Sequence, residues 1–423
     1  MIAMSIRTLS IAMLAASIIV APARADDIDG FMLGKANLFA RNNTPLNPGN
    51  RFRLPDDSVE TALLLEGTVR KLRFRFRAEA RGAIATARDD DEWPQDARLR
   101  VQQLYLPVLT TKAVVVQAGK QVRSWDQGLS YTPLGFFRSN PDIRDPVDVE
   151  GRVEGLPMLV VSHVGDRLAV EVVGSDRLGT GDAAQRDNGR QLAVRFSGQL
   201  VAGLDTALVV RQRAHAAPGI GASFAYAKDR IEIHADLYAG QPEAAYRRRA
   251  LFDAPPQYRT TDPLVFDAPR GFMVNSIVGG SFSASDRLTF RGEWAHHGDG
   301  VTKAEWRTYL RNITLHRDGL ATGDPRAVPS LAYDLSAMGQ GGIRRDYLFV
   351  GASYDGTVIS PSIYCLAGLA DGSTTTTASA TWKATPQLDL AVQATILAGS
   401  KTSEFGLSPF RAIISLRLLR RFR

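Results

Sequence analysis

Short segments in which apolar and polar residues alternate recur along the whole chain, and this alternation limits the possible folds more than any other feature. In 71–81 the apolar positions are Leu72, Phe74, Phe76, Ala78 and Ala80, and the polar ones are Arg73, Arg75, Arg77, Glu79 and Arg81. Segments 191–200, 231–238, 287–294 and 387–396 have the same period. Successive side chains of a strand point to opposite faces, so each segment predicts a strand with one apolar and one polar face.

The spacing of these segments separates a membrane barrel from a soluble sheet with one wet face. We expect strands near 30–41, 58–68, 71–86, 97–108, 112–121, 155–164, 167–175, 189–201, 204–215, 218–228, 230–241, 271–284, 287–298, 341–354, 356–369, 373–384, 386–398 and 407–422. Tight turns alternate with longer links, among them 42–57, 122–154, 242–270 and 299–340. Short turns at one end and long loops at the other are typical of outer-membrane barrels, which have an even number of strands.

The sequence therefore predicts an all-β protein, a transmembrane antiparallel β-barrel of about 18 strands with long extracellular loops. The last strand agrees, because Ile414, Leu416, Leu418 and Phe422 alternate with Ser415, Arg417, Leu419 and Arg421. Barrels of this class commonly end in such a strand with a terminal aromatic residue, although Arg423 follows Phe422 here.

The first 25 residues have the features of a secretory signal peptide. Arg7 precedes an apolar core, 9–20, and Ala23-Arg24-Ala25 is an A-x-A cleavage site. The alternative is a short anchoring helix, but the core is too short to span a bilayer. We expect residues 1–25 to be the signal peptide and 26–423 to form a single outer-membrane barrel, since no later segment has the roughly 20 apolar residues of a membrane helix.

One of the long links, 122–154, lies within the stretch 112–157. It contains Trp125, Phe136 and Phe137, followed by charges of both signs from Arg138 to Glu154. A loop of this length inside an ordered chain is usually functional or disordered, and its aromatic content argues against disorder. We expect it to fold into the barrel and narrow a pore, while the alternative is a solvated surface loop with local salt bridges.

Arginine side chains on the polar faces are the strongest candidates for a functional site. Guanidinium groups match carboxylates and phosphates, and rings of Arg or Lys select anions in pores. The expected pore-lining residues are Arg73, Arg75, Arg77, Arg81, Arg123, Arg138, Arg144, Arg152, Arg195 and Arg291, with Arg211 and Arg213 as further members. The alternative is that these arginines pair across strands and brace the barrel, with Glu60, Glu66, Glu79, Glu232 and Glu293 as partners.

Signals for catalysis and metal binding are weak. Residues 89–92 are acidic and His296-His297 lies beside Asp299, but adjacent strand residues face opposite ways, so a shared metal is not expected. The chain has no G-x-S-x-G motif, and Cys365, its only cysteine, lies in an apolar segment. We expect no enzyme activity, no cofactor and no metal.

The run GKQVRSWDQG at 119–128, with NPDIRDP at 140–146, resembles a pattern in outer-membrane porins of the alginate-export type. The resemblance covers about 40 residues and implies an eighteen-stranded barrel with an arginine-lined, electropositive pore for an anionic polysaccharide. It would make Arg73, Arg75, Arg77 and Arg123 pore-lining, and it differs at Lys120, where that family often has Arg.

Together these features predict an outer-membrane porin that passes anionic solutes, an acidic polysaccharide or organic acids, by passive diffusion. The formal charge of +7 becomes +5 once Arg7 and Arg24 leave with the signal, a modest excess that favours anions. Expected partners are outer-membrane lipid or lipopolysaccharide, the barrel-assembly machinery and the anionic permeant, with no nucleic acid. The alternatives are a barrel hydrolase and a plugged structural or surface-binding barrel.

Overall fold

The computed structural model describes residues 28–69, 71–82, 96–137, 153–176, 190–214, 216–241, 271–338 and 343–422. The expected signal peptide, 1–25, lies outside these residues, as does the acidic run 89–92.

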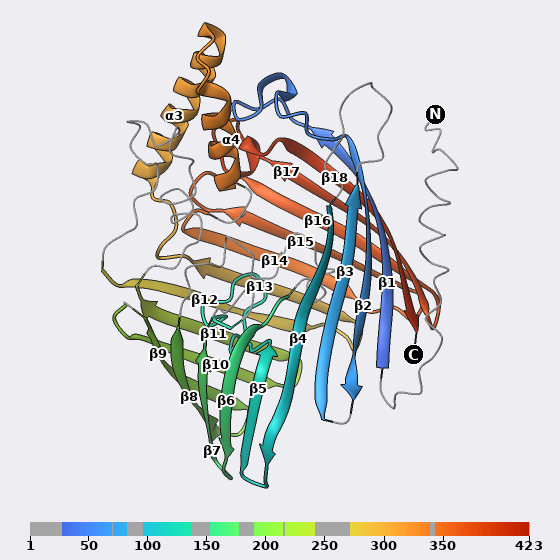
Figure 1. Cartoon of the computed structure of the whole chain (residues 1–423), viewed down its shortest axis with the longest axis vertical. Helices are drawn as coiled ribbons and strands as arrows, with labels where there is room; N and C mark the ends of the chain where they lie inside the picture. Colours follow the sequence, from blue (N-terminus) through green and yellow to red (C-terminus); the bar gives the residue numbers. More distant parts are fainter. Residues whose placement is uncertain are drawn as a thin grey trace.

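Eighteen antiparallel strands make up the described fold, in agreement with the number that the sequence predicts (Figure 1). They are β1 Ile28–Arg41, β2 Asp57–Val69, β3 Leu72–Gly82, β4 Asp96–Thr110, β5 Val114–Gln121, β6 Leu156–Val164, β7 Leu168–Ser175, β8 Gln191–Val201, β9 Leu204–Arg213, β10 Gly219–Lys228, β11 Ile231–Gly240, β12 Met273–Ser283, β13 Leu288–His296, β14 Asp346–Tyr354, β15 Ile359–Gly368, β16 Thr374–Thr385, β17 Leu388–Ala398 and β18 Phe410–Phe422.

The sheet closes on itself, because the first strand pairs with the last as well as with the second. Leu33 of β1 lies opposite Leu419 of β18 on one side and opposite Ala62 of β2 on the other. Every other strand pairs with its neighbours in chain order. Closure gives each of the eighteen described strands a partner strand on both sides, which a bilayer-spanning sheet requires.

The links between strands differ in length at the two ends of the barrel. Those that follow even-numbered strands have two to four residues, and those that follow odd-numbered strands have five to 49. We call these the short-turn end and the long-loop end. The alternation confirms the link pattern that the sequence predicts.

The two faces of the wall have opposite character, as β11 illustrates. His234, Asp236 and Tyr238 point inward and are buried, whereas Ile233 and Leu237 point outward and are 53% and 44% exposed. On β18, Arg417 and Ser415 are buried while Leu416 and Leu418 are exposed on the outer face. The period-2 assignment from the sequence is therefore confirmed for both strands.

Two helices in the link between β13 and β14 were not predicted from the sequence. They are α3 Lys303–Thr322 and α4 Ala327–Met338, which stand above the long-loop end in Figure 1. Thr302 and Glu305 form a capping box that starts α3, and Gly323 ends it in the left-handed conformation. Neither helix is long and apolar enough to cross a membrane.

The helices pack onto two other links of the long-loop end, and we call this assembly the cap: α3, α4 and residues 42–56, 297–302, 343–345 and 399–409. Its buried core consists of Leu46, Val301, Trp306, Tyr309, Ile313, Leu331, Ile343 and Leu407. The strand expected over 341–354 starts only at Asp346, because the amide of Ile343 bonds Glu404 in the cap instead of a neighbouring strand. The 3-10 helices η1 (Pro48–Asn50) and η4 (Phe405–Leu407) belong to the same region.

Candidate functional site

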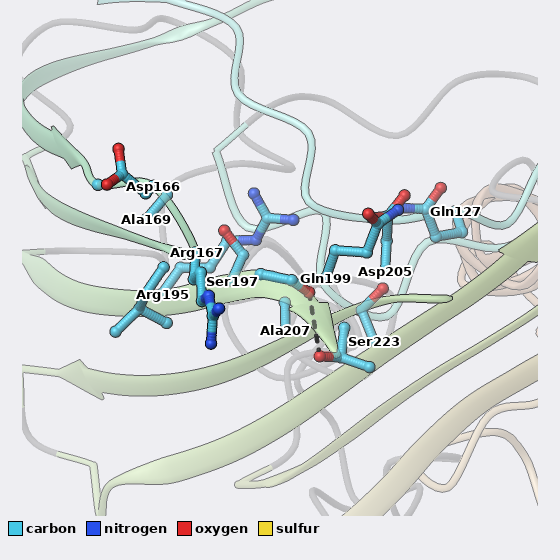
Figure 2. Close-up of a pocket in the computed structure, with 14 residues that line it drawn as sticks. Gln127, Asp166, Arg167, Ala169, Arg195, Ser197, Gln199, Asp205, Ala207 and Ser223 are labelled. Atoms are coloured by element: carbon cyan, nitrogen blue, oxygen red, sulfur yellow. Dashed lines mark hydrogen bonds between the residues drawn. The ribbon is translucent and has the colours of Figure 1, made fainter. Parts of the chain in front are cut away.

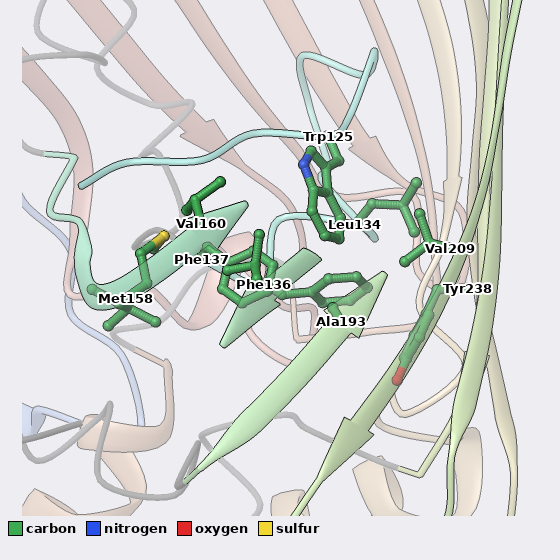
Figure 3. Close-up of a cluster of buried hydrophobic side chains, with 11 residues drawn as sticks. Trp125, Leu134, Phe136, Phe137, Met158, Val160, Ala193, Val209 and Tyr238 are labelled. Carbon is green, nitrogen blue, oxygen red and sulfur yellow. The ribbon is translucent and has the colours of Figure 1, made fainter. Parts of the chain in front are cut away.

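The link after β5 folds into the barrel, as the sequence predicts. We call its described residues, 122–137 and 153–155, the inner loop. Trp125, Phe136 and Phe137 are 3%, 6% and 0% exposed and pack in a cluster with the inward side chains of β6 to β9 and β11 (Figure 3). The other members are Leu134, Leu156, Met158, Val160, Val173, Ala193, Val209 and Tyr238. The aromatic residues thus supply the apolar surface that holds this segment inside.

Two glycines allow the chain to leave the wall and return to it. Gly119 of β5 has φ +128°, and a Cβ there would lie 2.3 Å from the carbonyl oxygen of Leu104 on β4. A Cβ on Gly155 would lie 2.3 Å from the carbonyl carbon of Gln121, where the two ends of the inner loop meet. Side chains at either position would force the backbone apart.

Two buried carboxylates of the wall hold the backbone of the inner loop. Asp236 of β11 accepts hydrogen bonds from the amides of Gln127 and Gly128, at 2.7 and 3.2 Å. Glu293 of β13 accepts bonds from the amides of Leu129 and Ser130, at 2.9 and 2.7 Å. Both are on the inner face, and hydrogen bonds to an ionised acceptor are stronger than neutral ones.

His234 and Tyr131 extend this attachment. His234 Nε2 lies 3.1 Å from Glu293 Oε1, which orients the carboxylate toward the loop. The ring of Tyr131 stacks on His297 with centroids 3.9 Å apart, and His297 in turn contacts Tyr347. Burial, together with the neighbouring His296, lowers the pKa of His297 to about 4, so its ring is neutral between the two tyrosines at neutral pH.

Arg73, Arg75 and Arg77 lie on the inner face of β3, and two of them form ion pairs. Arg75 forms an ion pair with Glu66 at 2.5 Å. Arg77 is fully buried and lies 3.7 Å from Glu60 and 3.1 Å from Glu79. These pairs are the bracing interactions that the sequence left open as the alternative.

Arg73 and Arg81 are the other two arginines of β3 in the expected set. Arg73 is exposed and forms no ion pair within the described part of the chain. The backbone of Arg81 lies opposite that of Glu60 on β2.

The remaining expected arginines occupy three settings. Arg123 lies 3.6 Å from Glu171 and also bonds Gln117, so it braces the base of the inner loop. Arg195 faces the interior beside that loop, and Arg291 lies exposed on the inner face of β13, two residues from Glu293. Residues Arg138, Arg144 and Arg152 lie outside the described residues.

Arg211 and Arg213, the further members of the set, lie on the inner face of β9. The guanidinium of Arg211 is buried 4.1 Å above the ring of Phe136 and donates to Gln191 at 2.7 Å. Arg213 donates to the carbonyl oxygen of Gln241 at 3.1 Å. Arg211 therefore contributes a cation–π contact to the seating of the inner loop.

Comparison with solved structures finds proteins of similar backbone arrangement but very low sequence identity. OpdK of Pseudomonas aeruginosa, crystallised with vanillate, aligns over 94% of this chain and 99% of its own, with 11% identity and a TM-score of 0.49. OprD of Pseudomonas aeruginosa aligns over 95% of this chain and 96% of its own, with 8% identity and a TM-score of 0.46. A mutant of the Rh. blastica porin aligns over 93% of this chain and 99% of its own, with 10% identity and a TM-score of 0.42.

No family model matches the sequence, and no curated protein matches it. At this level of likeness, the assignment of the fold rests on the chain's own strand register, and the function has to be argued from its own residues.

The sequence pattern does not single out the two carboxylates that hold the inner loop. In that pattern Asp236 is one of several polar positions in the alternating segment 231–238, and Glu293 is a partner for arginine. The signal that could have found them is an acidic residue in mid-strand on the inner face, where a buried charge needs hydrogen-bond donors. Within the described residues no group of three His, Cys, Asp or Glu side chains is placed to hold a metal ion.

Proposed function

We propose that this chain is an outer-membrane channel that passes anionic solutes by passive diffusion. The observation that supports it most is a closed barrel whose outer face is apolar, whose inner face is charged, and whose inner loop is fixed to the wall by Asp236 and Glu293. In a channel, the apolar outer face contacts lipid, the charged inner face lines the passage and the inner loop narrows it. A soluble barrel does not need an apolar outer face.

The outer face is continuous across neighbouring strands. Val278, Trp294 and Leu348 lie side by side on β12, β13 and β14 and are 47%, 41% and 41% exposed. Val210 of β9 and Ile220 of β10 are a similar exposed pair. Soluble proteins rarely expose apolar patches of this extent, whereas lipid accommodates them. We therefore propose lipid or lipopolysaccharide as the partner of this face. For β18, which ends in Phe422, we propose the barrel-assembly machinery as the partner.

The preference for anions rests on the cations that reach the lumen without a carboxylate partner. Arg73 and Arg291 are exposed on the inner face and form no ion pair among the described residues. Unpaired guanidinium groups attract and match carboxylates. The paired members, Arg75, Arg77 and Arg123, would stabilise the wall and contribute less to selectivity.

Small organic acids fit the barrel better than a polymer. Inner-face side chains of the wall from β16 through β18 to β3 are buried, including Thr377, Arg417, Ser58 and Arg77. An open lumen would leave such side chains accessible to water, so the passage is narrower than the strand number alone permits. An acidic polysaccharide, as in the alginate-export resemblance, is the less favoured permeant.

The same burial favours a second candidate function, a plugged surface-binding barrel that conducts nothing. A barrel hydrolase has less support. His234 bonds Glu293, but its Nδ1 is buried and has no hydrogen-bond partner in the described part of the chain, so the pair lacks a nucleophile there.

Efflux from proteoliposomes tests the proposal. Vesicles loaded with radiolabelled gluconate, glucose or choline should lose gluconate fastest once the barrel is inserted, and Arg291→Gln together with Arg73→Gln should reduce that preference. Retention of all three solutes would contradict a channel and support the plugged barrel. Fastest loss of choline would contradict the preference for anions.

A further inference from the structure

A cavity of about 340 Å³ lies in the inner wall between the inner loop and the short-turn end. It is lined by the turn that joins β6 to β7, by β8, β9 and β10, and by Gln127 of the inner loop. Its volume is at the lower end of the range for small-ligand sites. A solute that has passed the inner loop would meet this cavity before it leaves the barrel.

Arg195 supplies the cavity with a half-buried cation that forms no ion pair among the described residues, although the carboxylates of Glu171 and Asp236 act on it from a longer range. It lies opposite Glu171 in the register of β7 and β8, but other donors occupy that carboxylate. Glu171 accepts from Trp125 Nε1 at 2.8 Å and from the hydroxyl of Ser162 at 3.0 Å, and the Arg123 guanidinium lies 3.6 Å away. Arg195 Nε is buried and has no hydrogen-bond partner among the described residues.

Groups of the opposite kind lie across the cavity from the arginines. Figure 2 shows Arg167 and Arg195 on one side, with Asp166 beside Arg167 in the same turn, and Gln127, Asp205 and Ser223 on the other. One side offers forked donors for a carboxylate, and the other offers acceptors for hydroxyl or ammonium groups. A ligand with a carboxylate at one end and donors at the other would satisfy both sides.

We propose that this cavity is a binding site for a small carboxylate that carries hydrogen-bond donors at its far end, such as a hydroxy acid with distal hydroxyl groups or an amino acid with a side-chain amide. The role of the site in transport rests on the proposed function, but binding to it does not. A plain aliphatic carboxylate would leave Asp205 and Gln127 without donors, so it would bind less tightly.

Equilibrium dialysis of the purified full-length barrel in detergent measures this binding whether or not the barrel conducts. Radiolabelled gluconate represents hydroxy acids, glutamine represents amino acids, and butyrate represents carboxylates without distal donors. We expect gluconate, glutamine or both to bind at least about tenfold more tightly than butyrate, and the arm that binds identifies the ligand class. Arg195→Gln should weaken this binding about tenfold or more.

Arg287→Gln is the matched control, because Arg287 is an exposed arginine in another turn of the short-turn end, between β12 and β13. It should leave the binding unchanged. Butyrate binding as tight as that of gluconate and glutamine, or equal binding by wild type and Arg195→Gln, would overturn the site. A barrel that binds gluconate but releases no solute from vesicles would instead overturn the proposed function and leave the site standing.

Discussion

The carboxylate of Glu293 on β13 accepts a hydrogen bond from the amide of Ser130, 2.7 Å away, so the far wall of the barrel holds the inner loop. Asp236 does the same for Gln127. Each carboxylate accepts bonds from two backbone amides, and a hydrogen bond to a charged group contributes about 1.5–3 kcal/mol, against about 1 kcal/mol for a bond to the neutral amide oxygen of Asn or Gln. We therefore predict that Asp236→Asn with Glu293→Gln loosens the inner loop, seen as larger and noisier single-channel currents in planar bilayers.

Glu232→Gln is the control for that variant. Glu232 lies on the same face of β11, is partly exposed, and accepts a bond from Ser281 on the neighbouring strand, 3.0 Å away. Its current should match that of the wild type. Unchanged currents in the Asp236/Glu293 variant would show that the apolar cluster around Trp125 suffices to hold the loop.

Arg77→Met should destabilise the barrel strongly. The side chains of Arg77 and Glu60 are 1% and 3% exposed, and a buried carboxylate that loses its cation costs about 3–5 kcal/mol. Urea unfolding in detergent measures the loss. The exposed pair of Arg317 with Asp318 on α3 gives the comparison, because Arg317→Met should cost at most about 1 kcal/mol. Equal losses for the two variants would refute the structural role of Arg77.

Trp294 and Trp382 should contact lipid chains. They are 41% and 48% exposed on the outer face, whereas Trp125 and Trp306 are buried inside the barrel and the cap. In vesicles of brominated lipid, a variant that keeps only Trp294 and Trp382 should lose most of its fluorescence. A variant that keeps only Trp125 and Trp306 should retain it. Strong quenching of the second variant would contradict the assignment of the two faces.

The cap should be less stable in alkaline than in acidic solution. Burial raises the pKa of Glu404 from 4.5 to about 7, although it accepts bonds from Tyr347 and Ile343. Because the folded pKa is the higher one, this group costs nothing below about pH 4.5. Its cost grows as the pH rises and is complete above about 7, at roughly 3 kcal/mol.

Hydrogen exchange of the amides at 403–407, corrected for the intrinsic rate, measures this cost. Wild type should lose protection relative to Glu404→Gln as the pH rises from 5 to 8. His297 acts in the opposite sense, because its pKa is lowered to about 4 and its contribution is lost as the pH falls from 6.5. The comparison with Glu404→Gln cancels that contribution. A constant difference between the two proteins would contradict the prediction.

The strands could be predicted because their signal is local. In β11 and β18, whether a side chain points inward or outward follows from whether its sequence number is odd or even. The alternation of polar and apolar residues is regular because the outer face contacts lipid and the inner face contacts water or protein. That the inner loop folds into the barrel could also be predicted, because Trp125, Phe136 and Phe137 are large apolar side chains that need burial.

The contacts of the site could not be predicted in the same way. Gln127 and Asp236 are 109 residues apart in sequence, and they meet because the inner loop folds into the barrel as far as β11. The helices α3 and α4 were missed because their apolar residues face the cap core and their pattern is weaker than that of the strands. Which arginines are paired depends on the strand register, as for Arg75 opposite Glu66.

The reversal potential of the channel in a planar bilayer under a potassium chloride gradient tests the central claim most directly. Guanidinium groups such as those of Arg73 and Arg291, which lack carboxylate partners in the described residues, should draw chloride through the lumen faster than potassium. The account predicts a reversal potential of the sign set by chloride, which moves toward zero in Arg73→Gln with Arg291→Gln. A potential of the sign set by potassium, or no current at all, would contradict it.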